Sequence, residues 1–121
     1  MLVLKLISWF ERGADIREKD ATDIYYLIKH YAKIPEVLAA LYDQEFMEAQ
    51  DYDELAASAM KIAKDARLIA STDTLTFINK RFFEDKQKLD SLALNISRTP
   101  VIEYEYAEKL LNIMKQQFNE F

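Results

Sequence analysis

Hydrophobic residues recur along most of this chain at the three- and four-residue spacing that α-helices require. The clearest example lies between Asp20 and Ala32, where apolar side chains at positions 21, 24, 25, 27, 28 and 31 form one stripe. Such a stripe is typical of a helix that packs one face on a core. The sequence contains one glycine and two prolines, so it offers few of the turns that sheets need. We therefore predict an all-α protein.

The pattern predicts a single domain over residues 1–121, folded as a compact bundle of about six helices. The predicted helices cover residues 2–12, 20–32, 35–42, about 51–70, 73–83, 85–97 and 103–121. Residues 45–50 fit either a helical turn or a loop, and the helices at 73–83 and 85–97 fit one continuous helix equally well. The last helix carries a heptad seam, and we expect it to pack inside the bundle.

The first predicted helix is apolar on nearly every side and ends at Gly13, the expected C′ residue. Helices without a polar face are normally buried all round. This one lies at the N-terminal edge of a small domain, so we expect a further segment or partner beside it. Lys5 shares one face of it with Trp9 and Arg12. The ammonium of Lys5 either reaches water past its apolar stem or belongs to a site.

Composition excludes several classes of function. The formal net charge of −5 argues against a protein that wraps nucleic acid, which would carry a basic stripe. The absence of cysteine excludes a disulfide and a cysteine-based zinc site. The opening MLVLKLISWF lacks the charge pattern and cleavage site of a signal peptide, and no apolar run is long enough to span a bilayer. We expect a cytoplasmic protein without a membrane segment.

Charged residues crowd around the only glycine. Arg12, Arg17 and Lys19 precede the carboxylates Asp20 and Asp23. Taken singly, Asp20 is a good helix N-cap and Asp23 completes something like a capping box. Taken together with Lys5, the group forms a compact polar cluster in which cations suit phosphate groups. The only histidine, His30, has no second ligand at a metal-site spacing, so we expect it at the surface or half-buried.

The stretch LKLISWFERGADIREKDATDIYYLIKHY resembles the distal part of the AbiEii/AbiGii-like nucleotidyltransferases. These proteins belong to the DNA polymerase β-like superfamily and include toxins of abortive-infection and toxin–antitoxin systems. The family pattern has a lysine on a helix, then an arginine and a basic-Asp-x-x-Asp-aliphatic motif. Here these are Lys5, Arg12 and the run from Lys19 to Ile24. The later Lys64-Asp65 falls at a recurrent basic-Asp pair, and the likeness fades after about residue 70.

The resemblance implies transfer of a nucleoside monophosphate from an NTP, with Mg²⁺, to an acceptor. Lys5, Asp20 and Asp23 would be catalytic, and Lys5, Arg12 and Lys19 would bind the nucleotide. The family's Gly-Ser turn is absent from this sequence. The only Asp-x-Asp, at residues 51–53, follows the lysine motif and opens a helix, so we expect caps there and not a metal pair.

We therefore expect the C-terminal helical part of a nucleotidyltransferase, without the family's α/β core and inactive by itself. Neither metal nor cofactor is expected on this chain alone. Its expected partner is the N-terminal nucleotidyltransferase domain or subunit; an antitoxin or a second copy of the chain is also open. The alternative function is a helical interaction or dimerisation module without catalysis, which the heptad seam and the apolar first helix would also fit.

Overall fold

The computed structural model describes residues 2, 5–7, 14–98 and 102–119, with only the backbone described for 14–18. This part of the chain is helical and contains no strand, which confirms the predicted all-α class. The helices are α2 (Ala14–Tyr31), α3 (Pro35–Asp43), α4 (Phe46–Ala49), α5 (Glu54–Ile69), α6 (Thr72–Ile78), the π-helical η1 (Asn79–Phe83), α7 (Lys86–Arg98) and α8 (Tyr104–Asn119).

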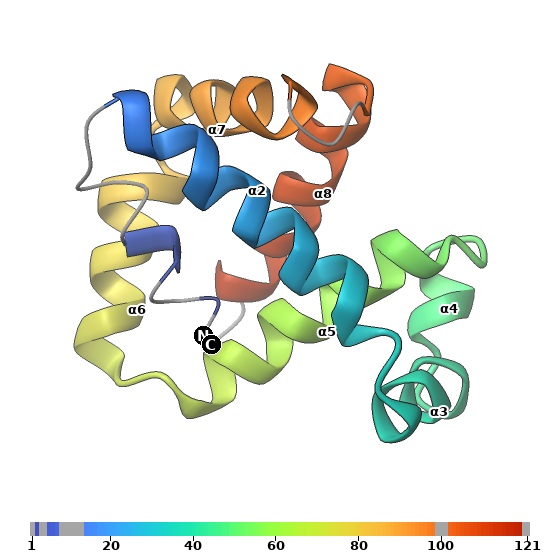
Figure 1. Ribbon diagram of the computed structural model, residues 1–121. Coiled ribbons are helices and arrows are strands. Elements are labelled where there is room, and N and C mark those ends of the chain that lie inside the picture. Colours follow the sequence, from blue (N-terminus) through green and yellow to red (C-terminus); the bar gives the residue numbers. More distant parts are fainter. Residues whose placement is uncertain (1, 3–4, 8–13, 99–101, 120–121) are drawn as a thin grey trace.

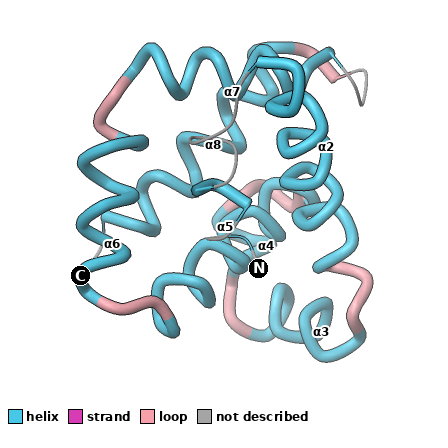
Figure 2. The backbone as a smooth tube through the Cα atoms, turned by 60° about the vertical axis from the view of Figure 1, so that its left-hand side comes forward, coloured by secondary structure: helices cyan, strands magenta, loops and turns pink. Residues whose placement is uncertain are grey.

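Helices α5 and α8 are the central pair of the bundle. They make the most extensive helix–helix contact, and α8 also packs on α7. Helix α2 crosses the molecule and contacts both α5 and α7, while α3 and α4 lie together at one end (Figure 1 and Figure 2). The buried hydroxyl of Ser58 on α5 donates a hydrogen bond to the carbonyl oxygen of Ile28 on α2, which links the two helices. The site described below lies where α2 and α5 meet.

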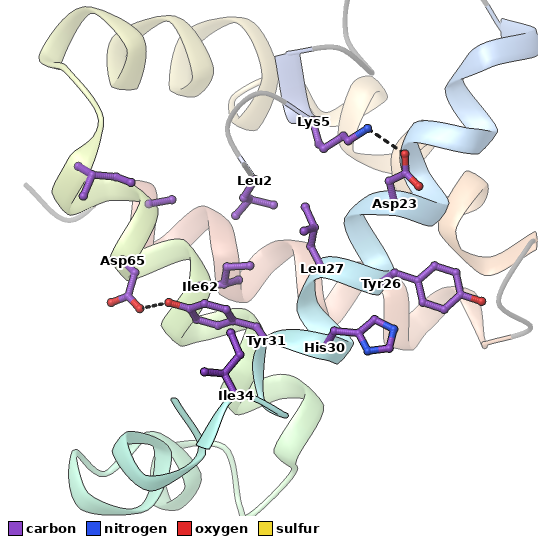
Figure 3. A pocket seen from close by; sticks show the side chains of 12 residues that line it. Leu2, Lys5, Asp23, Tyr26, Leu27, His30, Tyr31, Ile34, Ile62 and Asp65 are labelled. Atoms are coloured by element: carbon purple, nitrogen blue, oxygen red, sulfur yellow. Dashed lines mark hydrogen bonds and ion pairs between the residues drawn. The ribbon is translucent and has the colours of Figure 1, made fainter. Parts of the chain in front are cut away.

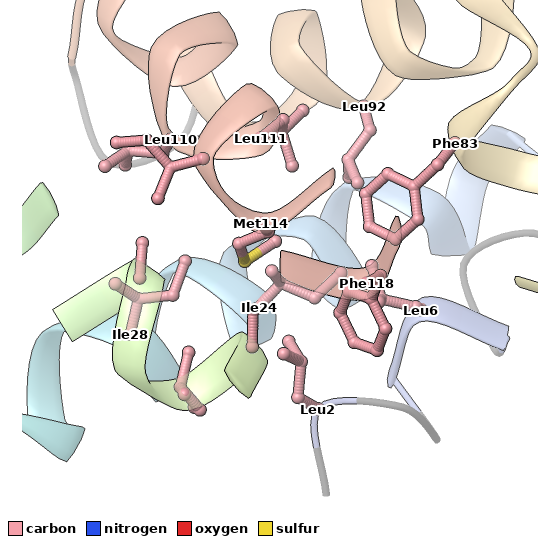
Figure 4. Packing of buried hydrophobic residues seen from close by; sticks show 14 of the residues in the cluster. Leu2, Leu6, Ile24, Ile28, Phe83, Leu92, Leu110, Leu111, Met114 and Phe118 are labelled. Atoms are coloured by element: carbon pink, nitrogen blue, oxygen red, sulfur yellow. The ribbon is translucent and has the colours of Figure 1, made fainter. Parts of the chain in front are cut away.

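The predicted heptad seam of α8 lies inside the bundle, as expected. Ala107, Leu111, Met114 and Phe118 are all buried. Figure 4 shows Leu111, Met114 and Phe118 among side chains from α2, α7 and η1. Burial of such side chains contributes roughly 1.5–3 kcal/mol each and is the main force that holds the helices together. A smaller cluster fastens α3 and α4 to the start of α5; its members are Ala32, Val37, Leu41, Phe46, Met47 and Ala57.

Helix α2 begins earlier than predicted, and this changes the role of one carboxylate. It starts at Ala14, so Asp20 lies inside the helix and is not its N-cap. Nothing between Ala14 and Asp20 breaks a helix, whereas the prediction relied on Asp20 as a start signal. The side chain of Asp20 is only 1% exposed. The capping box expected for Asp20 and Asp23 is therefore wrong.

Other predicted helix limits hold more closely. Pro35 occupies the first turn of α3, and residues 46–49 form the short helix that the sequence left open. Asp53 caps α5 by accepting a hydrogen bond from the backbone N–H of Ala56 at 3.2 Å. The last residue of α5, Ile69, continues the apolar spacing of the helix but is 84% exposed.

The segment between α6 and α7 differs from one continuous helix. Ser71 caps α6, and the chain continues without a break into the π-helical η1. A new helix starts after Asp85, whose side chain accepts hydrogen bonds from the N–H groups of Gln87 and Lys88. Within η1 the amide of Asn79 donates to the carbonyl of Phe118 at 2.9 Å, which fastens this segment to the end of α8.

The first predicted helix is only partly described. Residues 2 and 5–7 are helical, with Leu2 and Leu6 buried in the main core. Trp9, Arg12 and Gly13 lie outside the described residues. Lys5 is the one member of the predicted polar face whose side chain can be followed.

Candidate functional site

Lys5 forms an ion pair with Asp23 of α2. The two charged atoms, Nζ of Lys5 and Oδ2 of Asp23, are 2.9 Å apart. Their side chains are 30% and 35% exposed, so both groups are partly desolvated and still reachable by solvent. The sequence prediction that Lys5 faces a carboxylate of the adjoining helix is confirmed for Asp23.

This ion pair borders a cavity with a volume of about 590 Å³. The cavity lies between the N-terminal residues, α2 and α5, and its walls are mainly apolar (Figure 3). Its apolar lining includes Leu2, Leu27, Ile34, Ile62 and Ile69. A cavity of this size, with apolar walls and few polar groups, has the character of a ligand site.

A second polar group lies on the opposite wall from Lys5 and Asp23. The hydroxyl of Tyr31 donates a hydrogen bond to Asp65 Oδ2, and Asp65 also pairs with Lys61 at 3.0 Å. Lys61 and Asp65 are four residues apart on α5, a spacing that places two side chains on the same face of a helix. Burial, followed by the hydrogen bond to Asp65 and its charge, raises the pKa of Tyr31 to about 12. Tyr31 therefore stays a neutral hydrogen-bond donor at physiological pH.

The aromatic side of the cavity comes from consecutive turns of α2. Tyr26 and His30 stack with ring centroids 5.7 Å apart and an angle of 21° between the planes. Both are exposed, whereas the neighbouring Tyr25 is buried in the core. His30 lies at the surface, as predicted. Tyr26 and His30 both line the cavity, and in Figure 3 their rings lie on the side of α2 away from Tyr31.

The other residues predicted for the site are placed differently. Asp20 is buried, takes part in an interaction, and does not line the cavity. Lys19 is exposed and does not line it either. Arg12 lies outside the described residues, as does the side chain of Arg17. Of the predicted cluster, the described structure brings Lys5 and Asp23 together at the cavity.

The donor groups that the structure describes do not fit a metal ion. Among residues 2, 5–7, 14–98 and 102–119, no three His, Asp or Glu side chains converge as metal ligands would. The Asp-x-Asp at residues 51–53 is no exception, because Asp53 serves as a helix cap and Asp51 adopts a left-handed backbone with φ of 54°. We therefore derive no metal-dependent step from these residues.

Comparison with known proteins adds no family assignment. The chain matches no family model, and neither the curated proteins nor the solved structures contain a match to it. Within the described part of the chain, every helix is too short or too polar to cross a membrane.

The sequence alone did not reveal the hydrogen bond between Tyr31 and Asp65. These two residues are 34 positions apart and meet because α2 packs across α5. The sequence indicated only that Tyr31 and Asp65 each lie at the border between the apolar and the polar face of their helix. Such an edge position indicates partial burial but not a partner.

Proposed function

We propose that this chain is the helical part of a nucleotidyltransferase-like protein, which transfers a nucleoside monophosphate from an NTP to an acceptor. Lys5 contacts the nucleotide phosphates in this proposal, and Asp23 holds its ammonium in place. The triphosphate-binding turn and the metal-binding carboxylates would come from another domain or subunit. The chain alone is then inactive.

One observation carries the proposal: Lys5 Nζ lies 2.9 Å from Asp23 Oδ2 at the border of the 590 Å³ cavity. A lysine that only extends into water would have no partner from the motif that follows it. A partly exposed ion pair contributes little to stability, roughly 0–1 kcal/mol. The pair therefore leaves the ammonium free to exchange its carboxylate for a phosphate, which offers more negative charge.

Asp20 has a positioning role in this proposal. At 1% exposure its carboxylate does not reach a ligand in the cavity. Asp20 lies one helical turn before Asp23 on α2. In this proposal, its buried contacts hold the turn of the helix that carries Asp23. Lys19 is exposed on the same turn and adds a second positive charge outside the cavity.

Two experiments test the proposal on the purified chain. The first adds Mg²⁺ and NTPs labelled at the α-phosphate. We expect no labelled protein or RNA, and turnover by the chain alone would contradict the assignment of the metal site to another domain. The second follows the Lys5 and Asp23 side chains by NMR during titration with a nucleoside triphosphate.

We expect saturable shifts at Lys5 and Asp23, and a dissociation constant raised about tenfold by Lys5→Gln through loss of a charge-assisted contact. Lys80→Gln is the matched control, since Lys80 is an exposed lysine on η1. Equal binding by wild type and Lys5→Gln would remove the basis of the nucleotide site.

A helical interaction module is the second candidate, and a different observation favours it. Leu68 and Ile69, at the end of α5, are 68% and 84% exposed, and Ile34 across the cavity is 45% exposed. Exposed apolar side chains that lie close together often mark a protein interface. A concentration-dependent dimer that Ile69→Glu disrupts, together with no response to NTP, would support this function over the transferase.

A further inference from the structure

The cavity beside Lys5 is much larger than a contact with one phosphate group requires. Its volume of about 590 Å³ lies within the range of about 300–1,000 Å³ that is usual for small-molecule sites. The apolar wall includes Leu27 of α2 together with Ile62 and Ala66 of α5. Aliphatic walls of this kind gain nothing from a phosphate, whereas they gain from the burial of an apolar group. The walls therefore indicate a ligand with an apolar body.

The charged side chains that line the cavity are balanced by partners within the protein. Lys5 Nζ lies 2.9 Å from Asp23 Oδ2, and Asp65 pairs with Lys61 at 3.0 Å. The hydroxyl of Tyr31 donates its hydrogen bond to Asp65. A ligand carboxylate or amine would have to replace one member of an ion pair and leave the other without its partner, which is unfavourable. An uncharged ligand leaves both ion pairs intact.

The ion pair of Lys5 and Asp23 still has hydrogen-bonding capacity for such a ligand. An ammonium carries three donors and a carboxylate can accept several hydrogen bonds, whereas the contact between them uses one donor and one oxygen. A hydroxyl group can accept from the ammonium and donate to the carboxylate at the same time. In Figure 3, Leu27 and Ile62 lie between this ion pair and Tyr31, so an aliphatic chain attached to the hydroxyl can extend over them.

We propose that this cavity binds an uncharged amphiphile, whose aliphatic body packs against Leu27, Ile62 and Ala66 and whose hydroxyl group bonds to Lys5 and Asp23. Burial of the aliphatic body supplies the affinity, and the hydroxyl group fixes the orientation. The proposal goes beyond the nucleotidyltransferase function and does not rest on it, because binding of the amphiphile requires neither an NTP nor another domain.

The test is a titration of the purified chain with 1-octanol, followed by methyl NMR. We expect saturable shifts of the Leu27 and Ile62 methyl groups, one octanol per chain, and intermolecular NOEs from the octanol chain to these methyl groups. Octanoate and octylammonium carry a similar alkyl chain with a charged head group. Each should bind about tenfold more weakly than octanol, because each separates Lys5 from Asp23.

Two variants locate the octanol. Leu27→Gln places an amide in the apolar wall and should raise the dissociation constant at least about tenfold. Leu38→Gln is the matched control, because Leu38 is also a partly buried leucine on a helix but does not line this cavity. Ala66→Leu fills part of the cavity without adding a polar group, so it tests the site even if Leu27→Gln folds poorly. It should weaken octanol binding by a similar factor.

Three outcomes would overturn the proposal. The first is equal affinity for octanol, octanoate and octylammonium, which would remove the role of the ion pair. The second is octanol binding that Ala66→Leu leaves unchanged. The third is a set of NOEs to exposed apolar residues outside the cavity, such as Phe77 and Leu94, in place of Leu27 and Ile62.

Discussion

The hydroxyl of Tyr106 lies 2.8 Å from both carboxylate oxygens of Asp53, which joins the first turn of α8 to the N-terminus of α5. The same carboxylate caps α5 through the N–H of Ala56, and Lys109 adds a cation 3.7 Å away. Burial and this hydrogen bond raise the pKa of Tyr106, so the hydroxyl remains a donor. Asp53 thus fixes the start of both central helices.

Replacing Asp53 should therefore cost more stability than replacing its neighbour in the same Asp-x-Asp. We expect Asp53→Ala to lower the free energy of unfolding by about 1–3 kcal/mol, through loss of the cap and of the partner of Tyr106. Asp51→Ala is the control and should change it by less than about 0.5 kcal/mol, because Asp51 is exposed. Urea denaturation measures both. Equal effects would mean that the contact with α8 contributes nothing.

Alkaline pH should weaken the contact between α2 and α5. The pKa of Tyr31 is raised to about 12 in the folded protein, against about 10 in an unfolded chain. Because the folded value is the higher one, the neutral hydroxyl stabilises the fold fully below pH about 10, and this contribution is lost as the pH rises to about 12. The stability difference between wild type and Tyr31→Phe should shrink over this range. Tyr42→Phe, an exposed control, should show no such change.

The two carboxylates of the motif that follows Lys5 should differ in their effect on stability. Asp20→Ala removes a buried, partnered group and should lower the free energy of unfolding by about 1–3 kcal/mol. Lys5→Met breaks a half-exposed ion pair and should change it by less than about 1 kcal/mol. Thermal and urea unfolding of both variants check this order. A large loss for Lys5→Met would make the pair with Asp23 a structural one.

Tyr52 offers a test of backbone strain between α4 and α5. Its φ is 63°, a left-handed conformation that is unfavourable for any residue with a Cβ, and its ring is 66% exposed. Tyr52→Gly should therefore leave stability unchanged or raise it by up to about 1 kcal/mol. The matched control is Tyr42→Gly, an exposed tyrosine inside α3, which should cost about 1 kcal/mol. Comparable losses for both variants would show that the ring of Tyr52 makes a stabilising contact.

Local patterns predicted the helices because their causes lie within a few residues. The pair of Lys61 and Asp65, the cap at Ser71 and the buried seam of α8 all follow from spacing along one helix. The start of α2 was missed because Asp20 carries a strong capping signal, although the residues before it form helix equally well.

The candidate site was only partly predictable, for a different reason. Lys5 and Asp23 belong to adjoining segments, and their pairing followed from that proximity. The cavity and the bond between Tyr31 and Asp65 depend on how α2 crosses α5, which no local pattern encodes.

Ile62, Asp65 and Ala66 of α5 line the cavity beside Lys5, whereas Met60, Lys64 and Arg67 line a smaller cavity of about 250 Å³. Because one helix contributes to the walls of both cavities, a substitution that changes the tilt of α5 would change the width of both.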